Sequence, residues 1–254
     1  MNEPNPRQLT HADLLQLKRW NTPTIYNGWE QITKRDAGRE GFNLEPVVDR
    51  MPGLGAMCGR AVTLVIEPGN PEHPKANPDA WIEYWRHVAS VPGPKVVVVQ
   101  DMDKPSLFGS AWGEVNASVH KVLGCVGAIV DGAARDLVEM ESLGFKVLSR
   151  AVCVGHAYAT PVRWGVDVEV FGRRISPGQL IHADRHGFLA VPAEDEARLL
   201  DASRIMDSNE CATYLAAVRD GAAGGPEATM DALVDARERF RATIRKHFGG
   251  AGEW

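Results

Sequence analysis

Cysteine is scarce in this sequence and never occurs in an arrangement that builds a site. The four cysteines, Cys58, Cys125, Cys153 and Cys211, are widely separated, with no C-x-x-C pair and no tight cluster with histidine. We therefore expect neither a thiol-rich zinc site nor a disulfide framework. Unpaired thiols are typical of a reducing compartment, so we predict a cytoplasmic protein.

Long apolar runs and an excess of positive charge are also missing. No stretch approaches the ~18 apolar residues that a membrane helix needs, and residues 1–6 contain no apolar core of a signal peptide. The formal net charge is −5, which gives no basic field to attract nucleic acid or anionic lipid. These absences predict a soluble protein that binds neither nucleic acid nor membrane.

The sequence does contain an ordinary balance of residues over its 254 positions, with 44% hydrophobic and 24% charged. A chain of this length can bury a substantial core without disulfides or metals. It suits one large domain with an extension. We place a main domain with N-terminal helices at residues 1–192 and a helical extension at residues 193–254.

The middle of the chain alternates short apolar runs with segments of helical spacing. Continuous apolar runs of this kind are typical of strands buried on both faces of a sheet. The predicted order is a strand at 95–100, a helix at 112–123, a strand at 126–130, a helix at 135–143 and a strand around 147–148. This order indicates an α/β fold with an at least partly parallel sheet.

The flanking segments have other patterns. Before the α/β part, the predicted elements are two short helices from Thr10 and Thr22, a loop at 36–56, a strand at 61–66 and a helix over 81–91. From about residue 163 the hydrophobic period becomes two, which predicts a β-meander. The extension is predicted to contain helices at about 193–206 and 208–219, a break at 221–226 and a last helix.

Two strand-to-helix turns carry the residues best suited to chemistry. The first covers residues 113–116 (GEVN), and the second covers residues 131–136 (DGAARD). In an open α/β sheet both turns would lie at the carboxyl ends of neighbouring strands, where ligands usually bind. Gly113 permits close approach of the backbone, and the free N–H groups at the helix start can hold a carboxylate.

Three side chains in these turns suit a small acid and a hard cation. Arg135 is a permanent cation whose fork matches a carboxylate or a 2-oxo acid. Glu114 and Asp136 offer the oxygen ligands that Mg²⁺ and Mn²⁺ prefer. The alternative is purely structural, because an acid in the first turn of a helix stabilises that helix and a surface Arg-Asp pair is usually only solvated.

The stretch GEVNASVHKVLGCVGAIVDGAARD closely resembles the central signature of the RraA-like family. The 4-hydroxy-4-methyl-2-oxoglutarate aldolase branch of that family has an acid, twenty intervening residues and then Arg-Asp, and Glu114 and Arg135-Asp136 stand at that spacing. The segments LGFKVLSRAV and ISPGQLIHADRHGFLAVP are similar to the family's later strands. The resemblance covers roughly residues 22–192. It implies a layered α/β fold of the swivelling β/β/α type, with a mixed sheet, a C-terminal β-meander and extra C-terminal helices.

The resemblance also implies an activity, which is that of a class II, metal-dependent lyase. Such an enzyme cleaves 4-hydroxy-2-oxo diacids to pyruvate, decarboxylates oxaloacetate, or does both. Asp136 would bind Mg²⁺ or Mn²⁺, Glu114 would hold a metal-bound water, and Arg135 would contact the oxo and carboxylate oxygens. Substrate contacts would also come from Gly113, Glu114, Val115 and Asn116. The family forms homotrimers or homohexamers with the site between subunits, and a neighbouring subunit supplies a further acid.

Some alternatives stay open at this point. The family's first acid is commonly Asp, and the longer Glu114 could displace the water and alter the activity. The RraA branch is a non-enzymatic regulator of an RNA-degrading enzyme and typically lacks that acid. Metal-assisted hydrolysis or isomerisation of another small acid is a further possibility. Methyl transfer is disfavoured because no Gly-rich nucleotide loop follows an early strand, and a Schiff base is disfavoured because no lysine is predicted within an apolar strand.

Several residues outside the two turns have mainly structural interpretations. His182 and His186 are expected to be core or surface histidines, because they lack the H-E-x-x-H context of a metal site. His156 and Tyr158 could line a pocket. The remaining residues are Trp81, Tyr84 and Trp85, expected in the core or a subunit interface, and Asn27, expected to pack or cap a helix.

Overall fold

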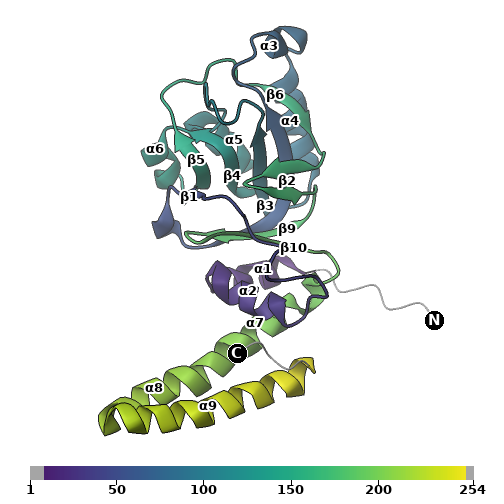
Figure 1. The fold of residues 1–254 in the computed structure, drawn as a ribbon. Helices are drawn as coiled ribbons and strands as arrows, with labels where there is room; N and C mark the ends of the chain where they lie inside the picture. The colour runs from purple at the N-terminus through teal and green to yellow at the C-terminus, as the bar shows by residue number, and fades with distance from the viewer. Residues whose placement is uncertain (1–8, 250–254) are drawn as a thin grey trace, which may run out of the picture.

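The computed structural model describes residues 9–249, so residues 1–8 and 250–254, at the outer ends of the two predicted units, lie outside it. A mixed sheet forms its centre, with strand order β1-β5-β4-β3-β2-β9-β10 and with β6 paired to β2 (Figure 1). A separate ribbon consists of β7 and β8. The strands are β1 Val48–Asp49, β2 Met57–Ile66, β3 Lys95–Asp101, β4 Cys125–Ala134, β5 Lys146–Val152, β6 Pro161–Trp164, β7 Val168–Val170, β8 Arg173–Ile175, β9 Leu180–Asp184 and β10 Gly187–Val191.

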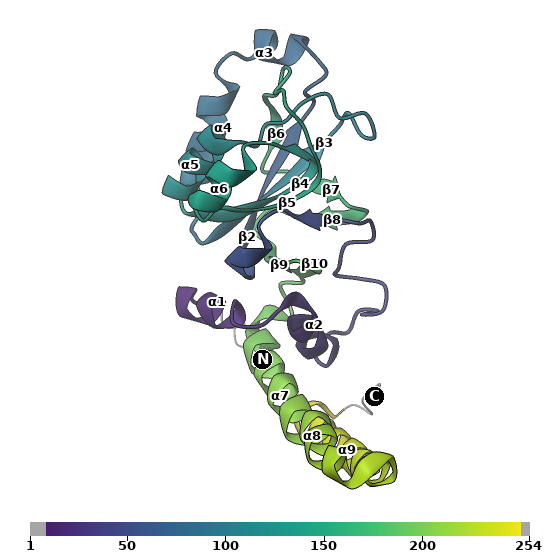
Figure 2. The same ribbon diagram turned by 90° about the vertical axis from the view of Figure 1, so that its left-hand side faces the viewer.

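Helices cover one face of this sheet, and the β7–β8 ribbon covers the other (Figure 2). Side chains of α4, α5 and α6 pack with one set of strand residues, and the ribbon packs with the alternate set. The helices are α1 His11–Leu17, α2 Thr22–Glu30, α3 Glu72–Ala76, α4 Ala80–Ser90, α5 Glu114–Val122, α6 Leu137–Ser142, α7 Glu196–Glu210, α8 Ala216–Gly221 and α9 Gly225–Phe248. The predicted α/β fold with a mixed sheet, a β-meander and C-terminal helices is confirmed.

Strands β2, β3, β4 and β5 run parallel, as the alternation of strands and helices predicts. The valines at 96–99 are fully buried because this part of the sheet is covered on both faces. The predicted end of the second strand at residue 130 is wrong, because β4 continues to Ala134. Its small residues keep pairing with β5 after a register shift between Val130 and Ala133. Helix α6 accordingly begins at Leu137 rather than at Arg135.

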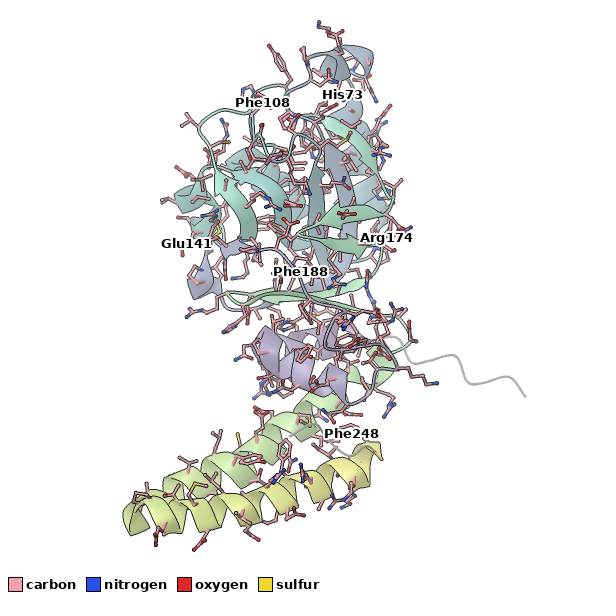
Figure 3. All side chains as sticks on the ribbon, viewed as in Figure 1. His73, Phe108, Glu141, Arg174, Phe188 and Phe248 are labelled. Atoms are coloured by element: carbon pink, nitrogen blue, oxygen red, sulfur yellow. The ribbon has the colours of Figure 1, made fainter. Side chains whose placement is uncertain are left out.

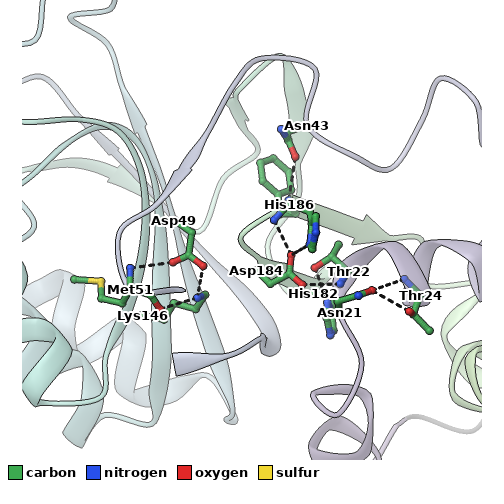
Figure 4. Close-up of polar contacts among 11 residues, drawn as sticks. Asn21, Thr22, Thr24, Asn43, Asp49, Met51, Lys146, His182, Asp184 and His186 are labelled. Atoms are coloured by element: carbon green, nitrogen blue, oxygen red, sulfur yellow. Dashed lines mark hydrogen bonds and ion pairs between the residues drawn. The ribbon is translucent and has the colours of Figure 1, made fainter. Parts of the chain in front are cut away.

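A buried histidine fastens the N-terminal helices to the β9–β10 hairpin (Figure 4). His182 Nε2 donates to the carbonyl of Leu17 (3.2 Å), so Nδ1 accepts from the hydroxyl of Thr22 (2.9 Å). Burial lowers the pKa of His182 to about 4, which keeps the ring neutral. Asp184 accepts the Thr22 N–H and pairs with the half-exposed His186. The two residues are thus a core and a surface histidine, as expected.

The C-terminal segment forms a helical hairpin that projects from the body (Figures 1 and 2). The prediction of separate helices at 193–206 and 208–219 is wrong. The helix is continuous from Glu196 to Gly221 through one π turn at Cys211–Leu215. Its base packs closely on α2, since a Cβ at Gly28 would collide with the backbone of Ser203. In the described part of the chain, no helix is both long and apolar enough to cross a membrane.

Candidate functional site

The two predicted turns lie side by side at the carboxyl ends of β3 and β4. The backbone of Trp112 bridges to Ala134, and Arg135 N–H donates to the Trp112 carbonyl (2.9 Å). Ser110 Oγ accepts the Trp112 N–H (2.9 Å) and donates to the Ala133 carbonyl (2.7 Å). Trp112 and Ser110 are both buried. The loop after β3 is therefore held against the end of β4 by backbone hydrogen bonds and by the buried Ser110 hydroxyl.

Asp136 connects the second turn to the first. Its Oδ2 accepts the backbone N–H of Glu114 at the start of α5 (3.1 Å). A Cβ at Gly113 would overlap that same oxygen, so only glycine allows this approach. Asp136 also has a left-handed backbone conformation, with φ of 53°, which non-glycine residues adopt rarely and mainly as Asp or Asn. Strained backbone of this kind is often found at functional sites.

Arg135 extends its guanidinium beside this carboxylate. Nε lies 3.6 Å from Asp136 Oδ2, and Nη1 donates to the carbonyl of Val154 (3.2 Å). Both side chains of the Arg-Asp pair are 34% exposed. Since a guanidinium carries five N–H donors, Arg135 retains donors that can meet an acid from solvent.

A cavity of about 200 Å³ opens between the two turns. Arg135 and Asp136 form one wall, and His156, which the sequence suggests as a pocket residue, forms another. Glu114 is exposed beside the opening, and its contact with Asp136 is made by its backbone N–H. The lining residues are Trp81, Ser110, Ala111, Gly113, Val115, Asn116, Arg135, Asp136, His156 and Ala159. The size suits a molecule of few heavy atoms, since drug-sized ligands occupy roughly 300–1,000 Å³.

Asn116 gives the cavity a polar wall from the first turn of α5. Its Nδ2 donates to the Ala111 carbonyl (2.6 Å), while its buried Oδ1 has no hydrogen-bond partner among the described residues. An unpaired buried acceptor is unfavourable unless a ligand or water meets it. The N–H groups of Val115 and Asn116 belong to the same helix start and can hold a carboxylate.

The donor set of the site fits a hydrated divalent cation only in part. Asp136 and Glu114 provide two carboxylates, and Mg²⁺ commonly takes one or two carboxylates and keeps several waters. Between residues 9 and 249, no group of three or more His, Cys, Asp or Glu side chains could hold a metal ion. Two acids from one chain therefore suit Mg²⁺ or Mn²⁺ with water or a further acid from outside.

Asp131, which begins the second turn in the sequence, is directed away from this cavity. It is fully buried and pairs with Arg150 (Oδ1 to Nη2, 2.6 Å) and with Lys104. Its Oδ2 also accepts the N–H of Phe171 from the loop after β7 (2.9 Å). The neighbouring Asp101 is buried as well, and desolvation raises the pKa of its carboxyl to about 6.

The expectation that no lysine lies buried in a strand is wrong. Lys95 and Lys146 begin β3 and β5 and are each only 2% exposed. Lys95 Nζ donates to the carbonyls of Val88 and Val91 at the end of α4, and burial lowers its pKa. Both residues lie at the amino ends of the parallel strands, at the edge of the sheet opposite the cavity.

A larger cavity of about 560 Å³ lies between the 35–41 loop and the 173–179 turn. Its arginines already have partners. Arg35 pairs with Glu194 and Glu40, and Arg174 pairs with Asp167. The third, Arg173, donates to the carbonyls of Phe42 and Arg39. The smaller cavity at Arg135 remains the better candidate, because it combines a cation, an acid and a free helix start.

Comparison with known proteins gives a consistent result for sequence and fold. The family model described as RraA-like, Aldolase/RraA, matches residues 22–190. A Halalkalibacterium halodurans protein, provisionally named 4-hydroxy-4-methyl-2-oxoglutarate aldolase, is 29% identical over 93 residues, which are 36% of this chain and 44% of that protein. The match thus spans under half the length of this curated relative.

Solved structures resemble the chain over most of its length. An uncharacterised protein from Pseudomonas syringae pv. tomato has a TM-score of 0.69 at 19% identity, covering 93% of this chain and 98% of that one. Streptomyces coelicolor RraAS2, described as an unusual member of the RNase ES inhibitor RraA family, has a TM-score of 0.63 at 22% identity, covering 80% and 96%. At these identities the likeness shows the fold alone.

Proposed function

Because this chain belongs to the RraA-like family, we propose that it is a divalent-metal-dependent carbon–carbon lyase acting on a small 2-oxo acid. The substrates we infer are 4-hydroxy-2-oxo diacids, cleaved to pyruvate, and oxaloacetate, decarboxylated to pyruvate. The observation that carries this proposal is the pairing of Asp136 with the first amide of α5, beside Arg135, at the wall of a small cavity. A class II aldolase needs these three elements together: an acid for a cation, a fixed positive charge and carboxylate-binding amides.

The residues of the cavity can bind and orient a 2-oxo acid. The free guanidinium donors of Arg135 would pair with the oxo and carboxylate oxygens. The N–H groups of Val115 and Asn116 would hold the carboxylate at the positive end of α5. Asn116 Oδ1 would accept a hydrogen bond from a substrate hydroxyl or a water. These contacts fix the bond to be broken relative to the charge that stabilises its products.

The reaction produces an enolate, and Arg135 is placed to stabilise it. In retro-aldol cleavage the hydroxyl proton leaves, the adjacent carbon–carbon bond breaks, and its electron pair becomes the enolate of pyruvate. Loss of carbon dioxide from oxaloacetate gives the same enolate. A preorganised cation at that oxygen is worth several kcal/mol in a site shielded from water. The exposed carboxylate of Glu114 would move the protons at the opening, through water.

We propose that Asp136 holds the metal ion, with Glu114 acting through water. When bound, Mg²⁺ or Mn²⁺ supplies a Lewis acid for the oxo group. The site offers two acids, and among residues 9–249 no group of three or more His, Cys, Asp or Glu side chains could hold a metal ion, which supports a third ligand from a neighbouring copy.

Three exposed valines surround the site. Val115 lies in the first turn, Val138 lies just after the second, and Val154 accepts the hydrogen bond from Arg135 through its carbonyl. Exposed apolar residues gathered in this way are expected on a surface that another copy covers. We therefore propose a homotrimer or homohexamer with the site between subunits.

The test is a coupled assay for pyruvate with the purified chain and Mg²⁺ or Mn²⁺. Oxaloacetate and 4-hydroxy-4-methyl-2-oxoglutarate should both be tried, and release should stop on chelation with EDTA. Failure of every 2-oxo acid despite bound metal would favour a hydrolase or isomerase of another small acid. Inhibition of an RNA-degrading enzyme, without metal and without pyruvate release, would instead favour the regulator.

A further inference from the structure

The C-terminal arm, residues 196–248, has only a small hydrophobic core of its own. Beyond its base on α2, it is a two-helix hairpin that projects from the body (Figures 1 and 2). Its separate core consists of Met206, Phe240 and Ile244, with Tyr214 and Phe248 partly buried against them. Two antiparallel helices alone present a long surface for so small a core, and helical hairpins are usually completed by further helices.

One face of this arm is apolar. Leu215 and Val218 are 58% and 48% exposed, and Met230 and Val234 are 59% and 64% exposed. Helical geometry places the pair on α9 and the pair near α8 on the same face, because the two helices run antiparallel. A groove of about 400 Å³ opens where Leu215 meets Tyr214, Phe240 and Glu210. Clustered exposed apolar residues of this kind mark interaction surfaces.

The charges on α9 are segregated along its length. The first half carries Glu227, Asp231 and Asp235. The second half carries five basic residues and one acid, Glu238; the basic residues are Arg237, Arg239, Arg241, Arg245 and Lys246, of which Arg239 pairs with Asp235 within the helix. Glu227 and Arg245 are eighteen residues apart, which is five whole turns, so they lie on one line along the helix about 27 Å apart. One end of the surface is therefore acidic and the other end is basic.

We propose that the arms of two copies of this chain pair antiparallel, about a two-fold axis, to complete a four-helix bundle. The charge pattern selects this occupant, because antiparallel pairing sets the acidic half of each α9 opposite the basic half of the other. Parallel pairing would set like charges together. An interface in which the same patch meets itself is the usual form of a two-fold contact. Met230, Val234, Leu215 and Val218 would then be covered.

This contact is independent of the proposed lyase activity. Figure 3 places Phe108, in the loop that leads to α5, and Phe248, at the end of α9, in different regions of the molecule, with the sheet and the N-terminal helices between them. Loss of the arm contact should therefore leave the cavity intact. A trimer built around the cavities would become a hexamer through the arms.

The first test is the mass of the full chain in solution, measured by light scattering for Val234→Asp. The expected result is a twofold fall in the mass of the assembly, with helical circular dichroism and pyruvate release unchanged. Ala228→Asp is the matched control, because Ala228 is exposed and lies about 120° from Val234 and about 160° from Met230 around α9. An unchanged mass for Val234→Asp, or an equal fall for both variants, would overturn the proposal.

Charge reversal gives a second test that does not depend on the apolar residues. Glu227→Arg and Arg245→Glu should each weaken the assembly, because each sets like charges together in a pair of identical copies. Mixing the two variants should restore the wild-type mass, since each arm then meets its complement. A mixture that stays at the lower mass would contradict antiparallel pairing.

Discussion

Two aspartates at the end of β4 are five residues apart and have opposite surroundings. Asp131 is fully buried and is neutralised by Arg150 and Lys104, with a further N–H from Phe171. Asp136 lies past the end of the strand, is 34% exposed, and has one arginine at 3.6 Å and one amide. Asp131 lies on the face covered by the β7–β8 ribbon, where it accepts the N–H of Phe171, whereas Asp136 meets the start of α5 on the helical side.

This difference distinguishes a structural acid from one that is available for chemistry. A buried carboxylate that satisfies all its acceptor sites within the protein has nothing left to bind. A half-exposed carboxylate in a strained backbone, with an unused oxygen, can still take a cation. Substitution of each aspartate should therefore affect a different property, with activity lost at one and stability lost at the other.

The largest effect is expected for Asp136→Ala. Pyruvate release should fall more than about 1000-fold, which corresponds to roughly 4 kcal/mol of transition-state stabilisation. The free energy of unfolding should change by less than about 1 kcal/mol, because the side chain is partly exposed and the substitution removes one hydrogen bond, that to the Glu114 N–H at the start of α5. Kinetics and urea denaturation of the same preparation measure both. If stability fell as much as activity, Asp136 would be a structural acid like Asp131, and the proposed difference between them would be refuted.

Asp131→Asn should behave in the opposite way. The substitution leaves Arg150 and Lys104 without their shared buried partner, and breaking a buried pair costs about 3 to 4 kcal/mol. Urea denaturation should show this loss in the free energy of unfolding. Activity per folded molecule should stay within about threefold of wild type, because the side chain lies outside the cavity. A specific loss of activity in well-folded protein would contradict this assignment.

Asp101 is a third case, because it is buried like Asp131 but its Oδ2 has no hydrogen-bond partner among the described residues. Its folded pKa of about 6 is above the unfolded value, so the unfolded state ionises first as pH rises. The loss of folding stability caused by ionising the buried carboxyl is absent below about pH 4, grows between about pH 4 and 6, and is complete above about pH 6. Relative to Asp101→Asn, the wild type should therefore lose about 2 to 3 kcal/mol of stability between pH 4 and pH 7. Denaturation of both proteins at the two pH values checks this, and a constant difference would refute it.

Gly113→Ala should have the smallest effect of the four. The new Cβ would overlap Asp136 Oδ2, so the carboxylate must move away from the amide of Glu114. We expect kcat/KM to fall about tenfold, or roughly 1.4 kcal/mol. Gly38→Ala is a control in an exposed loop, where the added methyl has only ordinary contact with Asp36. Similar kinetics for both variants would show that the close approach at Gly113 has no role.

The sequence is sufficient to predict the order of strands and helices in the α/β part, from β3 to β5, and the proximity of the two turns. Apolar runs at 95–100 and 126–130 identify neighbouring parallel strands, and parallel strands bring their following turns to one edge. The contact between Glu114 and Asp136 follows from that geometry. The resemblance to the RraA-like family adds the roles that we propose for these residues.

Other features could not be read from the sequence because they depend on distant contacts. Ser110 and Trp81 line the cavity only through tertiary packing. Gly132, Ala133 and Ala134 resemble a turn, yet they extend β4 because β5 supplies partners. Lys95 is buried because the end of α4 offers carbonyls to its ammonium group. Continuity of the helix through 207–215 likewise depends on packing against α9 rather than on local pattern.

Direct binding of Mn²⁺, followed by electron paramagnetic resonance of the free ion, tests the central claim most directly. Wild type and Asp131→Asn should both bind the ion, and Asp136→Ala should bind it at least tenfold more weakly. Binding by Asp136→Ala with undiminished affinity would contradict the assignment of this turn as the metal site.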